Sequence, residues 1–183
     1  MKVLMIIPAY NEEESILNTV LSIVEYRKKV DFDLDYVVIN DGSVDRTKEI
    51  LDSHNLSAIH LVMNLGIGGA VQTGYKYAFE NNYDVAVQFD GDGQHDIESL
   101  DTLLEPIRRQ QADLVVGSRF IGDKASEFQT TFMRRFGITI ISAFIKLTTG
   151  KRILDATSGY RLANRDIIRQ FAARYPIKYP EPE

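Results

Sequence analysis

The sequence predicts a single α/β domain with a mostly parallel central sheet and helices on both faces. Short apolar runs rich in β-branched residues alternate with longer segments of helical periodicity, a pattern typical of β-α-β units. A polar cluster follows each apolar run, as expected where the carboxyl ends of parallel strands build a ligand site. A length of 183 residues fits one domain with its own core.

The predicted strands are short apolar runs bounded by polar or glycine-containing turns. We expect them over Val3–Ile7, Asp35–Ile39, Ala58–Val62, Asp84–Phe89 and Asp113–Val116. Parallel strands buried on both faces have this composition. The run at the N-terminus is stopped by Pro8, so it is too short for the apolar core of a signal peptide.

The predicted helices between these strands carry apolar residues at spacings of three and four. We expect them over Glu12–Lys29, Asp45–His54, Gly69–Asn81 and Ile97–Gln110. Asp45 begins the second of them and Asp96 precedes the fourth, where an aspartate can accept a hydrogen bond from a first-turn N–H group. We therefore give both aspartates a capping role.

The alternation fades after Phe120. The segment Phe132–Leu147 is predicted to be a helix that is apolar nearly all round, and it fits either a buried core helix or one lying at a membrane surface. A last helix is expected over Asn164–Ala173. Three prolines among residues 175–183 predict an irregular tail, which leaves residues 1–174 as the domain.

Composition excludes several classes of protein. The net charge is −5 with no basic block, which argues against a nucleic-acid-binding protein. The chain has no cysteine, so it has neither disulfides nor thiolate metal sites. No apolar run approaches the roughly 20 residues that span a bilayer. We expect a soluble domain, or one that lies on a membrane surface.

The cluster Asp90-Gly91-Asp92 follows the fourth predicted strand. Two carboxylates separated by glycine can reach one hard cation such as Mg²⁺ or Mn²⁺, and Gln94 can add a carbonyl oxygen. Such an ion can bridge a diphosphate. The plainer alternative is a polar turn, which the other polar clusters along the same sheet edge make less attractive.

Three further clusters allow two interpretations each. Asp41 can accept a hydrogen bond from a base or ribose, or it can belong to an Asp-Gly turn, and we assign it to the ligand. Arg119 can bind a phosphate or form a surface ion pair. The glycines that begin at Gly66 follow the third strand, not the first, so they are a weak dinucleotide-binding signal and fit close backbone approach.

These clusters together resemble glycosyltransferase family two. The resemblance rests on five motifs in order, spread over most of the chain: Pro8-Ala9-Tyr10-Asn11-Glu12, Asn40-Asp41-Gly42-Ser43-Val44-Asp45-Arg46-Thr47, Gln88-Phe89-Asp90-Gly91-Asp92-Gly93-Gln94-His95, Gly117-Ser118-Arg119 and Asp155-Ala156-Thr157-Ser158-Gly159-Tyr160-Arg161. Within the family, the chain most resembles the branch of dolichyl-phosphate mannosyltransferases and polyprenyl-phosphate glycosyltransferases.

The resemblance implies a GT-A (Rossmann-like) fold and a metal-dependent, inverting transfer from a nucleotide-diphosphate sugar. It assigns the donor nucleotide to one set of residues: Pro8, Tyr10, Glu12, Asp41, Gly66 and Gly91. It assigns Mn²⁺ or Mg²⁺ to Asp90, Asp92 and Gln94.

The resemblance also implies an acceptor side. Arg119, Arg134 and Arg135 are expected to meet a lipid phosphate, and Asp155 lines the acceptor. A hydroxyl acceptor needs a base, for which Asp155 is the candidate, whereas a phosphate acceptor is already an anion. Family members continue past a segment like residues 179–183, so we expect part of the acceptor site and any membrane anchor to be missing.

The expected setting is the cytoplasmic face of a membrane, with a lipid-phosphate or glycan acceptor and no nucleic-acid partner. One rival is a nucleotidyltransferase, which would carry a glycine-rich, basic phosphate loop where this chain has Ala9-Tyr10-Asn11-Glu12. The other is a non-catalytic sugar-nucleotide-binding module, against which the paired carboxylates speak.

Overall fold

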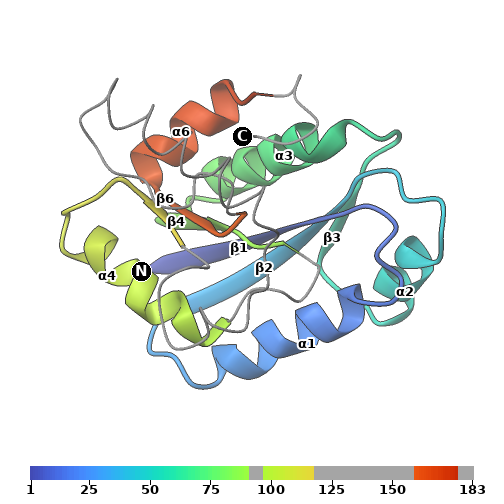
Figure 1. Ribbon diagram of the computed structural model, residues 1–183, viewed down its shortest axis with the longest axis horizontal. Coiled ribbons are helices and arrows are strands. Elements are labelled where there is room, and N and C mark those ends of the chain that lie inside the picture. Colours follow the sequence, from blue (N-terminus) through green and yellow to red (C-terminus); the bar gives the residue numbers. More distant parts are fainter. Residues whose placement is uncertain (91–96, 118–158, 177–183) are drawn as a thin grey trace, which may run out of the picture.

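The computed structural model describes residues 1–90, 97–117 and 159–176. Six strands form one sheet in the order β3-β2-β1-β4-β6-β5, with helices on both faces (Figure 1). Strands β1 (Lys2–Ala9), β2 (Asp33–Asn40), β3 (Ala58–His60) and β4 (Val85–Gln88) are mutually parallel. The predicted fold class, an α/β domain around a mostly parallel sheet, is confirmed.

The edge of the sheet beyond β4 departs from the predicted alternation. β6 (Arg161–Asn164) lies antiparallel between β4 and β5 (Leu114–Val116). β6 had not been predicted, and it separates two strands that follow one another in the chain. The carboxyl ends of β4 and β5 nevertheless meet at the same edge, because Gln88 and Val116 both pair with Arg161.

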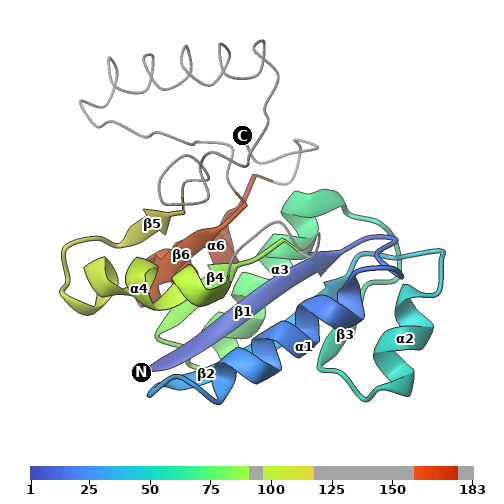
Figure 2. The ribbon, with the colours of Figure 1, turned by 60° about the horizontal axis from the view of Figure 1, so that its bottom comes forward.

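The helices divide the core into two layers. α1 (Ile16–Arg27), α2 (Thr47–Ser53) and α4 (Leu100–Arg108), which follows the short 3₁₀ helix η1 (Ile97–Ser99), pack against one face of the sheet. α3 (Gly66–Glu80) and α6 (Arg165–Ala173) cover the other face. Figure 2, turned from the view of Figure 1, shows α1 and α3 on opposite sides of β1. Burial of β1 on both faces explains its continuous apolar run.

Two predicted helix starts are wrong by about one turn. α1 begins at Ile16, not Glu12, because Asn11 adopts a positive φ of 57° and residues 13–15 form a turn. The carbonyl of Glu12 accepts hydrogen bonds from the N–H groups of Ser15 and Ile16. α3 begins at Gly66, three residues before the predicted start at Gly69. Polar side chains near these starts are therefore held in turns at the sheet edge.

The predicted caps can be checked at two helices. Either Asn164 or Asp166 could cap the last helix from its position in the sequence, and the structure selects Asn164, whose side chain accepts hydrogen bonds from the N–H groups of Asp166 and Ile167. Asp45 precedes the N-cap position of α2, Arg46, but its Oδ1 accepts a hydrogen bond from the Thr47 N–H at 2.9 Å. Asp96 and the helix predicted over Phe132–Leu147 lie outside the described residues.

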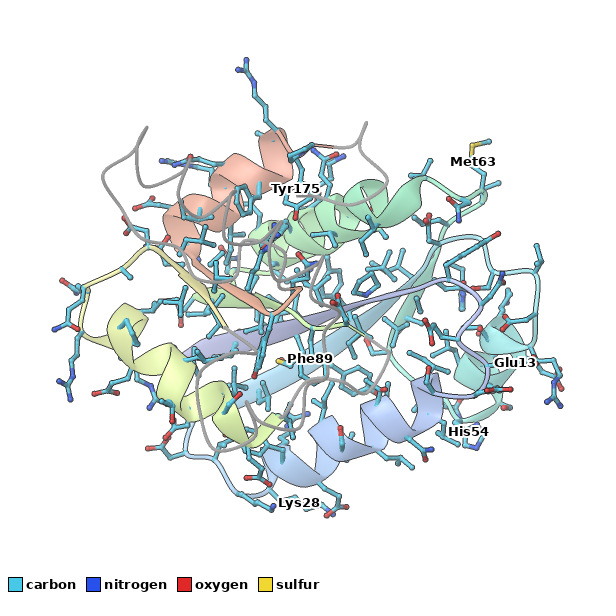
Figure 3. All side chains as sticks on the ribbon, in the orientation of Figure 1. Glu13, Lys28, His54, Met63, Phe89 and Tyr175 are labelled. Carbon is cyan, nitrogen blue, oxygen red and sulfur yellow. The ribbon has the colours of Figure 1, made fainter. Side chains whose placement is uncertain are left out.

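Tyr175 lies outside any helix or strand, yet its side chain is buried. Its ring packs against Tyr75 of α3 and Phe171 of α6, with ring centroids 5.7 and 5.2 Å away. Figure 3 shows Tyr175 beside α6 and α3. The segment that follows α6 is therefore anchored in the same layer of the core as α3.

Candidate active site

The segments that follow β1 and β2 are fastened to each other at the carboxyl edge of the sheet. The Asp41 N–H donates to the Ala9 carbonyl at 2.9 Å. The Asn11 N–H donates to Ser43 Oγ at 3.0 Å, and the Val44 N–H donates to Asn11 Oδ1 at 2.9 Å. These bonds use backbone and side-chain groups of both polar motifs, so the two motifs hold each other in place.

Asp41 has a structural role in addition to the ligand role that the sequence predicts. Its side chain is buried, and Oδ1 accepts a hydrogen bond from the Leu65 N–H at 2.7 Å. The neighbouring Gly42 has a φ of 67°, and a Cβ there would lie 2.7 Å from the Asn64 nitrogen. The segment after β3 therefore lies directly against the end of β2, which requires a glycine at position 42.

The other predicted nucleotide-binding residues lie along this edge in different settings. Pro8 is buried in β1 opposite Ile39, whereas Tyr10 is 48% exposed. The Glu12 N–H donates to Thr47 Oγ1 at 2.8 Å, and the Glu12 carboxylate accepts a hydrogen bond from the Ser15 hydroxyl. Gly66 begins α3 with a φ of 77°. The structure thus brings the ends of β1, β2 and β3 together.

Asp45 links the turn before α1 to the start of α2. Its Oδ2 accepts a hydrogen bond from the Glu13 N–H at 3.1 Å, in addition to the bond from Thr47. Partial burial acts to raise the pKa of the Asp45 carboxyl, but the hydrogen bonds from Thr47 and Glu13 outweigh it and lower that pKa. The structural role predicted for Asp45 fits these contacts.

His60 contacts the side chain of Asn40, the last residue of β2. Asn40 Oδ1 accepts a hydrogen bond from the Ser43 N–H at 3.1 Å, which leaves the amide NH₂ to donate to His60 Nδ1 at 3.0 Å. His60 Nε2 then donates to Asp52 Oδ1 at 3.1 Å. The imidazole at the end of β3 is therefore held between Asn40 and Asp52.

A hollow of about 330 Å³ beside this edge is lined by Asn11, Glu12, Glu13, Glu14, Ser15 and Asp45. Four carboxylates line it, and they would repel a diphosphate. Some of its polar groups are already engaged with each other: Asp45 Oδ2 accepts a hydrogen bond from the Glu13 N–H at 3.1 Å. The hollow contains neither Asp41 nor Asp90, so we place the candidate donor site along the strand ends instead.

The second half of the edge is built by β4 and β6. The Phe89 N–H donates to the Ile6 carbonyl at 2.9 Å, which extends the pairing of β4 with β1 and carries Asp90 to the end of the strand. Across from it, β6 begins at Arg161, and the Gly117 N–H after β5 donates to the Tyr160 carbonyl at 2.8 Å. Asp90, Gly117 and the 159–161 segment therefore meet at one place.

Asp90 is the one predicted metal ligand among the described residues. Its carboxylate oxygens are hard donors of the kind that Mg²⁺ and Mn²⁺ prefer. In the part of the chain that the structure describes, no group of three or more His, Cys, Asp or Glu side chains could hold a metal ion. Asp90 thus fits as one ligand of a site whose other predicted members, Asp92 and Gln94, lie outside the described residues.

The remaining predicted site residues also lie outside the described residues: Gly91, Arg119, Arg134, Arg135 and Asp155. Conversely, the structure gathers around the end of β4 four residues to which the sequence assigned no role there: Gln88, Gly159, Arg161 and Tyr175. Three of them belong to the quoted motifs, and that membership was the available signal. Their contact with one another depends on the antiparallel pairing of β6, which the sequence pattern did not reveal.

Comparison with known proteins identifies the family. The family model described as Glycosyl transferase family 2 matches residues 5–171. The chain belongs to this family. The resemblance drawn from the five motifs is confirmed, and the nucleotidyltransferase alternative is excluded. The stretch from β1 to α6 is therefore a glycosyltransferase domain.

Relatives within glycosyl transferase family 2 include proteins named for lipid-phosphate acceptors. The undecaprenyl-phosphate mannosyltransferase of Micrococcus luteus is 35% identical over 92% of this chain and 69% of its own length. The UDP-N-acetylglucosamine–dolichyl-phosphate N-acetylglucosaminyltransferase of Methanococcus voltae is 31% identical over 95% of this chain and 74% of its own. The chain thus spans roughly two thirds to three quarters of these relatives.

Solved structures share the fold at low sequence identity. Glucosyl-3-phosphoglycerate synthase from Mycobacterium tuberculosis, crystallised with Mn²⁺, UDP-glucose and phosphoglyceric acid, has a TM-score of 0.66 at 19% identity. The match covers 91% of this chain and 57% of that one. Mannosyl-3-phosphoglycerate synthase from Rubrobacter xylanophilus, at 14% identity, gives a TM-score of 0.68 over 91% of this chain and 55% of that one. These matches support the GT-A fold.

Across residues 1–90, 97–117 and 159–176, no helix is long and apolar enough to cross a membrane.

Proposed function

We propose that this family 2 domain transfers a sugar, with inversion, from a nucleotide-diphosphate sugar to a polyprenyl-phosphate acceptor. The observation that carries the proposal is the position of Asp90 just after β4, on the same sheet edge at which Asp41 follows β2. A family 2 domain with a carboxylate at that point fits binding of a metal-bridged diphosphate. The named acceptors of the relatives supply the acceptor class.

The donor would lie along the strand ends. Tyr10, exposed beyond β1, and Asp41 are suited to the base and ribose, because one offers a ring face and the other a carboxylate. Asp90 and Asp92 would hold Mg²⁺ or Mn²⁺. When bound, such an ion supplies positive charge that offsets the charge on the departing diphosphate.

The acceptor chemistry determines whether this chain must supply a base. A phosphate acceptor is an anion at neutral pH, so binding it beside a diphosphate chiefly needs positive charge. We assign that charge to Arg119, Arg134 and Arg135. Asp155 becomes a general base only if the acceptor is a hydroxyl. A lipid acceptor would also place the domain at the inner face of a membrane.

Calorimetry with UDP and GDP, each with and without Mn²⁺, tests the donor half of the proposal. We expect Mn²⁺-dependent binding of at least one nucleotide, weakened at least about tenfold in Asp92→Ala because a metal ligand is lost. Equal affinity with and without the ion, for both nucleotides, would refute the metal site.

Transfer of labelled sugar to a short-chain polyprenyl phosphate, compared with the matching polyprenol, tests the acceptor half. We expect transfer to the phosphate alone. Sedimentation with anionic vesicles tests the membrane assignment: replacing Arg134 and Arg135 by glutamate should release the domain, and unchanged sedimentation would rule those arginines out as the contact.

A further inference from the structure

The pairing of β4 with β6 places Asp90 opposite Gly159. Gln88 pairs with Arg161 across the two strands, and the same register carried past the strand ends sets Asp90 against Gly159. Opposed residues of an antiparallel pair project to the same face, as do residues two apart in one strand. Gln88, Asp90, Gly159 and Arg161 therefore share the face of the sheet that α3 and α6 cover.

Gly159 leaves the space that the Asp90 carboxylate occupies. A Cβ at position 159 would lie within 2.6 Å of Cγ and of both carboxylate oxygens of Asp90. Non-bonded atoms do not approach so closely, and the clash involves the functional group itself. Any side chain at position 159 must therefore move the Asp90 carboxylate.

Beneath this pair lies a buried polar layer. The Tyr175 hydroxyl donates to Gln88 Oε1 at 3.4 Å, and both side chains are almost fully buried. Burial raises the pKa of the Tyr175 hydroxyl, whereas the charge of Arg161 and its hydrogen bond to that hydroxyl lower the pKa, and the charge of Asp90 raises it. The Tyr175 hydroxyl therefore contacts β4 at Gln88, two residues before Asp90.

Arg161 is also suitably placed with respect to Asp90. The two residues are diagonal neighbours across the strand pair, a separation that a long side chain can bridge. The Arg161 guanidinium also hydrogen-bonds the Tyr175 hydroxyl, so the two side chains belong to one layer.

We propose that Gly159, Arg161 and Tyr175 are positioning residues that fix the Asp90 carboxylate in the orientation needed to bind a divalent cation and, through it, the donor diphosphate. The inference rests on the proposed function and deepens it. It assigns the 159–161 segment of a motif otherwise connected with the acceptor side to the donor half of the site.

The main test is Mn²⁺-dependent UDP binding to Gly159→Ala, measured by calorimetry, with free Mn²⁺ followed by electron paramagnetic resonance. We expect Mn²⁺ affinity to fall about 10- to 100-fold, as when the groups that orient a metal ligand are changed. UDP binding without metal should stay within about twofold of wild type, because the ends of β1 and β2 are untouched. A folded Gly159→Ala protein with wild-type Mn²⁺ affinity would overturn the inference.

A second pair of variants keeps the test decisive if Gly159→Ala does not fold. Tyr175→Phe keeps the ring and removes the hydroxyl, and we expect Mn²⁺ affinity to fall about threefold to tenfold, the value of one hydrogen bond. Tyr75→Phe is the matched control: its ring packs 5.7 Å from that of Tyr175, and its buried hydroxyl has no partner among the described residues. Equal effects, or no effect, in the two variants would refute the inference.

The two proposals fail in different ways. If wild type binds no nucleotide in the presence of Mn²⁺, the proposed function is wrong and the inference falls with it. If wild type binds, but Gly159→Ala and Tyr175→Phe lose only thermal stability, the proposed function stands and the three residues merely pack.

Discussion

The two halves of the candidate site are built in different ways. The half at the ends of β1, β2 and β3 is held by hydrogen bonds between loops, such as those from Leu65 to Asp41 and from Glu13 to Asp45. The half at the end of β4 depends on the register of two strands, with Gly159 leaving room for Asp90. In the first half, the groups expected to bind the nucleotide also hold the loops together. In the second, the predicted metal ligand is positioned by its neighbours.

This difference predicts different responses to mutation. Removing an aspartate from the loop half leaves a backbone N–H without its partner, so stability and nucleotide binding should fall together. Changing Asp90 leaves the pairing of β4 with β6 in place, so metal binding should fall with little change in stability. Each variant below tests this expected difference between the two halves of the site.

Asp90→Asn should have the largest effect. Asparagine has nearly the same shape but loses the negative charge that attracts a divalent cation, so Mn²⁺-dependent UDP binding should weaken by more than about 100-fold. Stability without metal should change by less than about 1 kcal/mol in urea unfolding. A comparable loss of stability would show that Asp90 also holds the strand pair together, which would erase the contrast between the halves.

Asp41→Ala should come next. The Leu65 N–H loses its acceptor, and the cost should be about 1–3 kcal/mol of unfolding free energy. UDP binding without metal should weaken as well. Asp41→Asn is the matched control, because its side-chain oxygen can still accept from Leu65, so most of the stability should return. If Asp41→Ala weakened only the metal-dependent part of binding, the assignment of Asp41 to the nucleotide half would be wrong.

Much of the loop half could be predicted from the sequence. Strands that end in Asn40-Asp41-Gly42 and Pro8-Ala9-Tyr10 must bring those residues to one edge, because consecutive parallel strands end on the same side. The double use of Asp41 could not be predicted, since the bond from Leu65 depends on how close the segment after β3 comes to β2. Periodicity carries no information about that distance.

For the half of the site at the end of β4, the sequence predicted the residues through their motifs but not their contacts. Asp90 and Gly159 were both singled out, but nothing in the spacing of 69 residues between them indicates contact. The contact arises because β6 enters the sheet antiparallel between β4 and β5. β6 is only four residues long, and its two buried residues are adjacent, so the sequence of this strand gives no periodic signal. The start of α1 was misplaced for a related reason: the turn at residues 12–15 depends on hydrogen bonds to Thr47 and Asp45, more than thirty residues away.

Asp45→Asn should have the smallest effect, and it probes the loop half without touching a predicted ligand contact. Hydrogen bonds lower the pKa of the Asp45 carboxyl in the folded state. The ionised group therefore adds stability above its unfolded pKa of about 3.9, and that contribution is lost as pH falls through the folded-state pKa. Asparagine replaces one of the two accepting oxygens of Asp45 by an NH₂ group, so at pH 7 Asp45→Asn should cost about 1 kcal/mol in urea unfolding. The difference from wild type should shrink between pH 5 and pH 3 (about one pH unit to either side of the unfolded pKa). A difference that stays constant over that range would mean that the hydrogen-bond geometry alone, without the charge of Asp45, holds the turn before α1 to α2.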